Sequence, residues 1–485
     1  MDNENCNKCD SHINTTDGSA LIASADIAII GGGVVGCAVA RRMALEGASV
    51  VLIEKAPDIL DGASKGNSAI LHTGFDAPVG SLEQKCVSRG YDEYLEIHKS
   101  LNLPLLKTTA MVAAWSKKEE ERFAGIMEKG LDNGVDDLCL LSKSQILAIE
   151  PDLADNVRAA ILVPREYVID PWSAPLAYLK QALKNGGKVL FNAEVVGGSF
   201  DGSRWMLNTK IGKVRATHVI NCAGLYGDIV DLNVLGKTQF AIQPRKGQFV
   251  VFDKAAGQFL KSIILPVPTE RTKGIVLFPT IFGNIVVGPT AEDQESRDDA
   301  CVDKKILKLL IDQAIEKLPA FANIPITTTY AGLRPASDKK HYRIIQDFDR
   351  NWLTLGGIRS TGLTGALGLA RHVHDLFSNQ GIGFEKIENP VVSDVPNLAE
   401  HLPRDWHTPD YGEIVCHCEM VTKREIIAAM EGTISAQSID GLKRRTRATM
   451  GRCQGFYCSA HLAQLTKGKF AQPIGIGHCI GKTDE

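Results

Sequence analysis

The stretch AIIGGGVVGCAVARRMALEGASVVLIEK, residues 28–55, decides the expected fold. Its apolar start belongs to a strand at 27–30, its middle has the periodicity of a helix over 34–46, and its end is a second apolar strand at 49–53. A strand, a glycine-rich turn, a helix and a strand in this order open a βαβ unit with parallel strands. The stretch therefore predicts a Rossmann-like α/β domain.

The turn in this stretch has the spacing of a dinucleotide site. Gly31 permits the tight turn, Gly33 lets a pyrophosphate approach the backbone, and Gly36 lets the helix pack closely on the strand. The N-terminus of the helix favours the anion. Glu54, at the end of the second strand, is placed to hydrogen-bond ribose hydroxyls. The turn alone does not distinguish FAD from NAD, and a glycine-rich turn that only packs two elements is the simpler alternative.

The remainder of the chain continues the α/β pattern and adds a second kind of strand. Apolar strands are expected near 188–191 and 217–221, and a last strand–helix pair near 352–376. Alternating polar and apolar residues predict antiparallel strands instead, with one solvated sheet face, at 247–253, 274–279 and 284–288. We therefore expect a mostly parallel sheet with an inserted antiparallel substrate domain.

Composition and charge limit the class of protein. The 485 residues are 44% hydrophobic and 23% charged, and the net charge of −3 gives no bulk attraction to nucleic acid. The longest apolar run, 27–40, is too short and too glycine-rich to be a transmembrane segment. Residues 1–17 lack the features of a secretory signal, so we expect a cytoplasmic protein, with peripheral contact at the inner face of the membrane left open.

A cysteine-rich module follows a proline-rich linker. Residues 385–412 contain four prolines and little helical pattern. Beyond them, Cys416 and Cys418 form CxC, and Cys453 and Cys458 form CxxxxC. Four thiolates on two short loops can hold a [2Fe–2S] cluster or one Zn²⁺. Basic residues lie just before the second pair and either offset the charge of a cluster or form a solvated helix face: Lys443, Arg444, Arg445 and Arg447.

Five further motifs, in this order along the chain, resemble the glycine/D-amino-acid-oxidase superfamily of FAD enzymes. Within it they are similar to glycerol-3-phosphate dehydrogenases and L-2-hydroxyglutarate dehydrogenases. The motifs are SKGNSAILHTGFDAPVGSLEQK at 64–85, VPREYVIDPW at 163–172, VINCAGLYGD at 219–228, YAGLRPAS at 330–337 and LTLGGIRSTGLTGALGLARHV at 353–373. The CxC and MGRCQGFYC motifs resemble the bacterioferritin-associated-ferredoxin-like domain, which carries [2Fe–2S].

The resemblance implies a domain plan. It gives a tail at 1–24 with an isolated CxxC at Cys6 and Cys9, an oxidoreductase domain at 25–384, the linker at 385–412, a [2Fe–2S]-binding domain at 413–470, and a tail at 471–485. In the oxidoreductase domain, the FAD-binding segments are about 25–85, 150–230 and 340–380, and the substrate-domain segments are about 86–149 and 231–339.

The resemblance also implies roles for single residues. Val195 would lie beside the adenine, Ala223 and Gly224 close to the FAD, and Ser68 at the substrate or the flavin. A second set would meet the isoalloxazine, with a helix that begins near Thr364 and directs its amides at the flavin: Gly357, Arg359, Gly362 and Thr364.

The implied reaction is the oxidation of a small anionic alcohol. His72 matches the general base of the family, and Arg334 matches the residue that holds the anionic group, although an arginine in a structural salt bridge is the simpler alternative. We expect oxidation of sn-glycerol 3-phosphate to dihydroxyacetone phosphate, with electrons leaving through the cluster to a quinone or an electron-accepting protein subunit. The alternatives are a 2-hydroxy-acid dehydrogenase of the L-2-hydroxyglutarate type, and an electron-transfer or assembly component without its own substrate.

Overall fold

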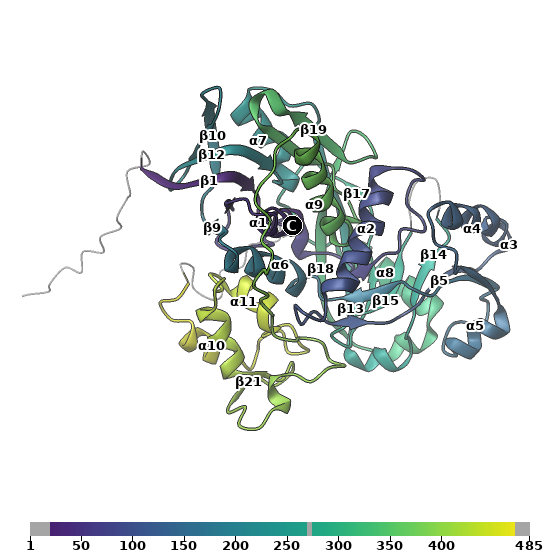
Figure 1. Ribbon diagram of the computed structural model, residues 1–485. Coiled ribbons are helices and arrows are strands. Elements are labelled where there is room, and N and C mark those ends of the chain that lie inside the picture. The colour runs from purple at the N-terminus through teal and green to yellow at the C-terminus, as the bar shows by residue number, and fades with distance from the viewer. Residues whose placement is uncertain (1–19, 269–273, 471–485) are drawn as a thin grey trace, which may run out of the picture.

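The structure, a computed structural model, describes residues 20–268 and 274–470 (Figure 1). Both expected tails fall largely outside this range, as do Cys6 and Cys9. No helix in the described part of the chain is long and apolar enough to cross a membrane.

The first sheet contains the predicted dinucleotide unit at its centre. Five strands pair in parallel, in the order β9–β2–β1–β12–β20, and antiparallel strands β10, β11 and β19 extend the edges. The bounds are β1 Leu21–Ile30, β2 Val50–Ile53, β9 Lys188–Leu190, β10 Val195–Phe200, β11 Trp205–Thr209, β12 Gly212–Asn221, β19 Arg343–Asp347 and β20 Trp352–Gly356. We expected a mostly parallel sheet. The structure has five parallel strands and three antiparallel ones.

The first strand is longer than its apolar core suggested. β1 begins at Leu21, which pairs with Lys213 of β12, so the last four residues of the expected tail belong to the strand. Leu21 and Ile22 are apolar but exposed, because pairing with the partner strand rather than a buried face holds this end of β1.

Helices cover both faces of this sheet. Four pack together on one face around a shared hydrophobic core: α1 Val34–Leu45, α2 Leu82–Ile97, α6 Ser173–Lys184 and α9 Gly362–Asn379. α7, Gly227–Leu235, packs on the other face through Val230 and Val234. Our assignment of residue 86 onward to the substrate domain was wrong for α2, whose buried Cys86, Tyr91 and Tyr94 belong to the core beneath the dinucleotide sheet.

The second sheet is the expected antiparallel substrate sheet, but the solvated face that we expected at these strands was wrong, because Phe249 and Val251 are buried in one core and Val250 and Phe252 in another. It has the order β17–β13–β16–β15–β14–β5–β7–β6, with β18 beside β13, and only its β14–β5 pair is parallel. The bounds are β5 Ala110–Ala114, β6 Cys139–Ser142, β7 Ala159–Val163, β13 Ile242–Phe252, β14 Ile263–Pro266, β15 Val276–Pro279, β16 Ile285–Gly288, β17 Glu292–Asp293 and β18 Ile326–Ser337. β7 was wrongly assigned to the FAD-binding segment 150–230, because long-range pairing with β5 decides its place.

Shorter elements complete the large domain. A small sheet of β3, β8 and β4 joins the two main sheets at Ile70–Leu71, Tyr167–Ile169 and Leu105–Leu106. The substrate sheet also carries α3 Lys117–Glu120, α4 Phe123–Asp132, α5 Lys143–Ile149 and α8 Lys304–Lys317.

The C-terminal module has its own small core. It consists of β21 Ile414–Cys416, β22 Val421–Thr422, α10 Lys423–Glu431, α11 Ile439–Thr446 and α12 Ser459–Leu465. A capping box starts α10, because Thr422 accepts from the backbone of Glu425 and Glu425 accepts from that of Thr422. α11 ends at Thr446, because Arg447 takes a left-handed conformation with φ +67°.

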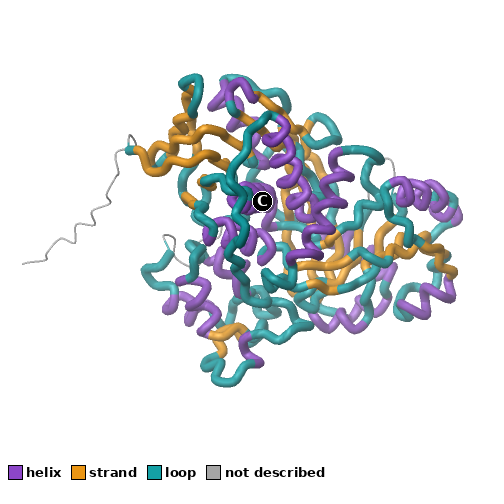
Figure 2. Tube along the Cα trace, in the orientation of Figure 1, coloured by secondary structure: helices purple, strands orange, loops and turns teal. Residues whose placement is uncertain are grey.

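Figure 2 shows the chain after α9 as one long loop that crosses the large domain to reach the module. Between 385 and 412 the only regular element is a short 3₁₀ turn at Asp405–His407. The loop is nevertheless packed, since Val395, Leu398 and Ala399 are buried in the cores of the large domain.

The module docks on the large domain through arginines. Arg445 donates two hydrogen bonds of 2.6 and 2.7 Å to Asp58, and the two side chains are 7% and 1% exposed. Arg444 donates to the carbonyl of Ile59 at 3.1 Å. Arg452 pairs with Asp253 at 2.7 Å but is 71% exposed.

Arg447 forms an ion pair within the module and contacts an aromatic ring of the large domain. It pairs with Glu419 at 2.8 Å and lies over the ring of Phe282 at 3.9 Å from the centroid. The solvated helix face that we considered is therefore wrong for Arg444, Arg445 and Arg447, which are buried.

Candidate cofactor and substrate site

A cavity of about 570 Å³ lies between the dinucleotide sheet and the substrate sheet. Its walls come from the β1–α1 turn, the end of β2, the β12–α7 and β20–α9 connections, and β18 of the substrate sheet. Ten of the twelve residues that we expected at the cofactor line it: Gly31, Gly33, Glu54, Ser68, Val195, Ala223, Gly224, Gly357, Arg359 and Gly362. Segments far apart in the sequence thus converge on one elongated site.

The glycines of the β1–α1 turn are needed for close backbone contacts. Gly31 has φ +108°, and a Cβ there would lie 2.6 Å from the carbonyl oxygen of Cys222. A Cβ on Gly36 would lie 1.9 Å from the carbonyl oxygen of Gly31. Gly36 therefore sits behind the cavity wall, in the helix-packing position that its spacing indicated.

Glu54 is fixed at the cavity wall by backbone amides. One carboxylate oxygen accepts from Gly32 at 2.5 Å and the other from Ala56 at 2.8 Å. Burial raises the pKa of Glu54, while these two amides oppose the shift. Each oxygen keeps a lone pair for a ribose hydroxyl, so the carboxylate is prepared to accept from a ligand.

The start of α9 forms the other end of the site. The helix begins at Gly362, two residues before the position that we expected, and Gly362 and Leu363 line the cavity. Arg359, just before it, has a buried Nε with no hydrogen-bond partner among the described residues. An orphaned buried donor in a cavity wall is typical of a ligand site that the protein chain alone does not complete.

Thr364 supports this end of the site without lining the cavity. Its hydroxyl donates to the carbonyl of Ile70 at 3.2 Å and accepts from the backbone N–H of His72 at 3.0 Å. It therefore fixes the backbone of β3 and of His72, the residue that follows this strand.

Arg334 projects from β18 into the cavity. Its two terminal nitrogens share one acceptor, the carbonyl oxygen of Thr290, at 3.3 Å each. No carboxylate of the described residues forms an ion pair with it, so the salt-bridge alternative finds no support there. Burial, together with the nearby charge of Arg245, lowers the pKa of Arg334 to about 10. A partly desolvated cation of this kind favours an anion in the cavity.

His72 follows β3 and is paired with a carboxylate that the sequence did not reveal. Its Nδ1 lies 2.8 Å from Oε2 of Glu166, which belongs to the turn between β7 and β8. His72 is not among the residues that line the cavity, but it is held by Thr364, one residue beyond the cavity-lining Leu363. Glu166 lies within the VPREYVIDPW motif, where nothing about its spacing indicates a partner 94 residues away.

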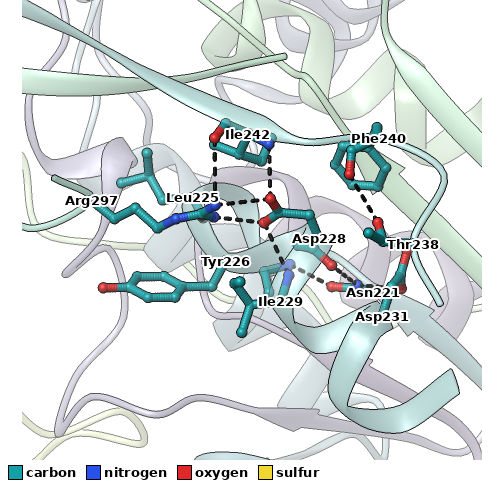
Figure 3. A network of polar contacts seen from close by, with 12 residues as sticks. Asn221, Leu225, Tyr226, Asp228, Ile229, Asp231, Thr238, Phe240, Ile242 and Arg297 are labelled. Carbon is teal, nitrogen blue, oxygen red and sulfur yellow. Dashed lines mark hydrogen bonds and ion pairs between the residues drawn. The ribbon is translucent and has the colours of Figure 1, made fainter. Parts of the chain in front are cut away.

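A segment of the substrate domain contacts α7 and the turn before it, at the wall of the cavity (Figure 3). Arg297 binds both carboxylate oxygens of Asp228 in α7, at 2.6 and 2.9 Å, and also donates to the carbonyl of Leu225. Tyr226 donates to Asp298 at 2.6 Å, and Lys55 lies 3.4 Å from the centroid of its ring. We call residues 289–303 the strap, because they join the two domains across the cavity.

The four module cysteines are close to one another in pairs. Cys418 is within hydrogen-bonding reach of Cys453, and Cys458 is within reach of Cys416. None of the four forms a disulfide. The described part of the chain contains no three His, Cys, Asp or Glu side chains at single-ion spacing.

The loop between Cys453 and Cys458 favours a thiolate. Backbone amides of Tyr457, Gly455 and Phe456 donate to the sulfur of Cys453 and lower the pKa of its thiol. A Cβ on Gly451 would lie 2.5 Å from Cβ of Cys418, so a glycine is required where the two cysteine loops meet. These features fit a cluster that takes two thiolates from each loop.

A dinucleotide cradle facing a substrate sheet, with a four-cysteine module docked beside it, defines a two-centre oxidoreductase. The comparisons with known proteins agree. Residues 26–376 match the family model "FAD dependent oxidoreductase", and residues 414–467 match "BFD-like [2Fe-2S] binding domain". The chain belongs to the FAD dependent oxidoreductase family, and its cofactors are FAD and a [2Fe–2S] cluster rather than zinc.

The similar proteins include two enzymes known by sequence and one solved structure. The "Glycerol 3-phosphate dehydrogenase" of Caloramator mitchellensis is 32% identical, over 93% of this chain and 95% of the relative. The mitochondrial "L-2-hydroxyglutarate dehydrogenase" of Homo sapiens is 30% identical, over 56% of this chain and 62% of the relative. The dithionite-reduced L-α-glycerophosphate oxidase of Mycoplasma pneumoniae, a structure with FAD bound, aligns with a TM-score of 0.71 and 26% identity, over 78% of this chain and 100% of the oxidase.

Proposed function

We propose that this chain oxidises sn-glycerol 3-phosphate to dihydroxyacetone phosphate. The observation that carries the proposal is Arg334, a cation that faces the cavity and has only a shared backbone carbonyl as acceptor among the described residues. A guanidinium with two free directions suits a phosphate. The similarity to a glycerol 3-phosphate dehydrogenase over nearly the whole chain supports the same substrate.

Each residue has one task in the proposed reaction. Arg334 holds the phosphate and thereby fixes the position of C2, and His72 takes the proton of the C2 hydroxyl. The bound flavin supplies the hydride acceptor, and the cluster supplies a one-electron outlet toward a quinone or an electron-accepting subunit.

A 2-hydroxy acid of the L-2-hydroxyglutarate type is the second candidate substrate. A guanidinium binds a carboxylate as well as it binds a phosphate, so Arg334 is compatible with both. The similarity to the human L-2-hydroxyglutarate dehydrogenase supports this candidate, although it covers a smaller part of the chain.

Anaerobic flavin bleaching separates the two. The purified holoenzyme is mixed with either compound in the absence of oxygen, and the flavin absorbance is followed. We expect rapid bleaching by sn-glycerol 3-phosphate and at least about 100-fold slower bleaching by L-2-hydroxyglutarate, because a misplaced anion loses the alignment of the reacting carbon. Faster bleaching by the hydroxy acid would reverse the assignment, and no bleaching by either would reject both substrates.

A further inference from the structure

The pair of His72 and Glu166 has the geometry of an oriented base. Glu166 is fully enclosed, with its side chain 1% exposed, while the side chain of His72 is 24% exposed. Oε2 of Glu166 faces Nδ1 of His72 at 2.8 Å. Oε1 accepts from the backbone N–H of Thr73 at 2.7 Å and from the Thr73 hydroxyl at 2.8 Å. Three donors thus fix the carboxylate in one orientation.

The position of Glu166 in the fold is equally constrained. Glu166 lies in the turn between β7 and β8, and a hydrogen bond fixes the backbone of this turn. The Thr108 hydroxyl donates to the carbonyl of Glu166 at 2.9 Å. Among the described residues, no lysine or arginine forms an ion pair with Glu166, and His72 is its one partner able to carry charge. A buried carboxylate without a fixed cation stabilises positive charge where the imidazole can acquire it.

We propose that Glu166 is the positioning residue of the base His72. This rests on the proposed function, in which His72 takes the hydroxyl proton. Glu166 keeps the imidazole proton on Nδ1, so that Nε2 is the ring nitrogen that takes the proton of the substrate hydroxyl. A bound flavin would supply the hydride acceptor, so that loss of the hydroxyl proton to Nε2 and of the carbon-bound hydride would leave a ketone. The carboxylate of Glu166, 2.8 Å from Nδ1, lies where it can balance the charge of the imidazolium.

Replacement by glutamine gives a sharp test, because an amide has only one acceptor oxygen. The backbone N–H of Thr73 can only donate, so the amide oxygen of a Glu166→Gln side chain must face Thr73. Its NH₂ group then faces Nδ1 of His72. Nδ1 must become an acceptor, and the imidazole proton moves to Nε2, where it blocks proton transfer from the substrate.

The first measurement uses stopped-flow flavin bleaching by sn-glycerol 3-phosphate across pH. We expect Glu166→Gln to slow bleaching by roughly 10²–10⁴-fold, the range for loss of a correctly oriented general base. The pH at which the rate rises should move lower, because the imidazolium loses its counter-charge. An unchanged rate and pH profile would overturn the proposal, and so would a slower rate with an unchanged pH profile.

Glu150→Gln is the matched control. Glu150 is 1% exposed and its carboxylate accepts only backbone amides of Lys261 and Ser262 among the described residues, so this change is equally buried and equally isosteric. We expect its bleaching rate and pH profile to match the wild type. An equal loss in both variants would mark the Glu166 effect as general destabilisation.

A second measurement does not depend on the substrate. With ¹⁵N-histidine labelling, the ring nitrogens of His72 are assigned by their disappearance in His72→Gln. In the wild type at high pH, the shifts should report a proton on Nδ1, and in Glu166→Gln a proton on Nε2. The same tautomer in both would refute the inference even if the protein oxidises another substrate. Failure of sn-glycerol 3-phosphate to bleach the wild type would refute only the proposed function.

Discussion

Arg334 shows at the scale of one residue how an anion is selected. The charge is fixed on a strand of the substrate sheet, partly removed from water, and given no carboxylate partner within the described chain. An anionic substrate supplies the missing partner. Its binding therefore also neutralises the charge of Arg334.

Arg334→Lys tests whether the planar fork is required. The lysine keeps the charge but makes no bidentate contact, so we expect KM to rise by about 30–100-fold, in line with roughly 2–3 kcal/mol for a charge-assisted hydrogen bond. Steady-state kinetics with an artificial acceptor measures this. Arg245→Lys, on the opposing strand position but outside the cavity lining, is the control and should leave KM within about twofold. Equal KM values in all three proteins would remove Arg334 from substrate binding.

The low pKa of Arg334 also predicts a pH dependence. The group holds an anion only when protonated, and burial lowers its pKa to about 10. The anion affinity is therefore complete at neutral pH and is lost as the pH rises through about 10. We expect KM to increase above that pH in the wild type, and a KM that stays constant up to pH 11 would contradict the assignment, which a pH series of initial rates will decide.

At the scale of elements, the strap is the part that joins the two domains over the cofactor cavity. Its contact with α7 is an ion pair in which Asp228 is nearly enclosed, and although burial by itself would raise the pKa of Asp228, the hydrogen bonds from Arg297 lower it. The cavity is lined from both sides of this contact. The Arg297–Asp228 pair therefore holds the strap against α7 at the wall of the cavity.

Arg297→Ala should therefore weaken FAD retention. The loss of a bidentate, mostly buried contact of about 1–3 kcal/mol predicts roughly 10–100-fold faster FAD release. The rise of free-flavin fluorescence after dilution measures the rate. Arg158→Ala removes an exposed pair with Glu120 and should leave the rate unchanged. If both variants release FAD at the wild-type rate, the strap has no part in retention.

Elements that depend on local patterns were predicted well, and contacts between distant elements were not. The β1–α1–β2 unit and the β20–α9 pair follow from apolar periodicity and glycine spacing, which are local properties. The place of β7 and α2 depends on partners far along the chain. The same holds for Glu166, because a buried carboxylate has no sequence signal that identifies a histidine 94 positions earlier.

The residues of the site show the same contrast between local patterns and distant contacts. The glycines and Glu54 were predicted because their spacing is fixed by the turn that they form, and the resemblance supplied the remaining cavity residues. The strap and the docking arginines were missed. Arg444 and Arg445 look like solvated helix residues by sequence, and only the position of Asp58, 387 residues from Arg445, shows that they are buried.

At the scale of the whole molecule, the module and the large domain share one buried ion pair. Asp58→Asn leaves Arg445 enclosed without a counter-charge, and we expect a loss of about 3–5 kcal/mol in module docking. Limited proteolysis within 385–412 should become faster by a corresponding factor. Arg452→Ala removes the 71%-exposed pair with Asp253 and should cost less than about 1 kcal/mol. Equal proteolysis rates in the two variants would show that Asp58 does not hold the module.

The same pair sets a condition for domain transplantation. Gly441 leaves the room that Asp58 occupies, since a Cβ there would lie 1.8 Å from its carboxylate oxygen, and Gly441 and Arg445 both travel with the module. Asp58 belongs to the recipient, in the loop that runs from Glu54 to the cavity wall at Asp61. A chimera built on a flavoenzyme without an acid at that position would inherit a void and an unpaired guanidinium. A host that receives this module therefore needs an acid at the position of Asp58.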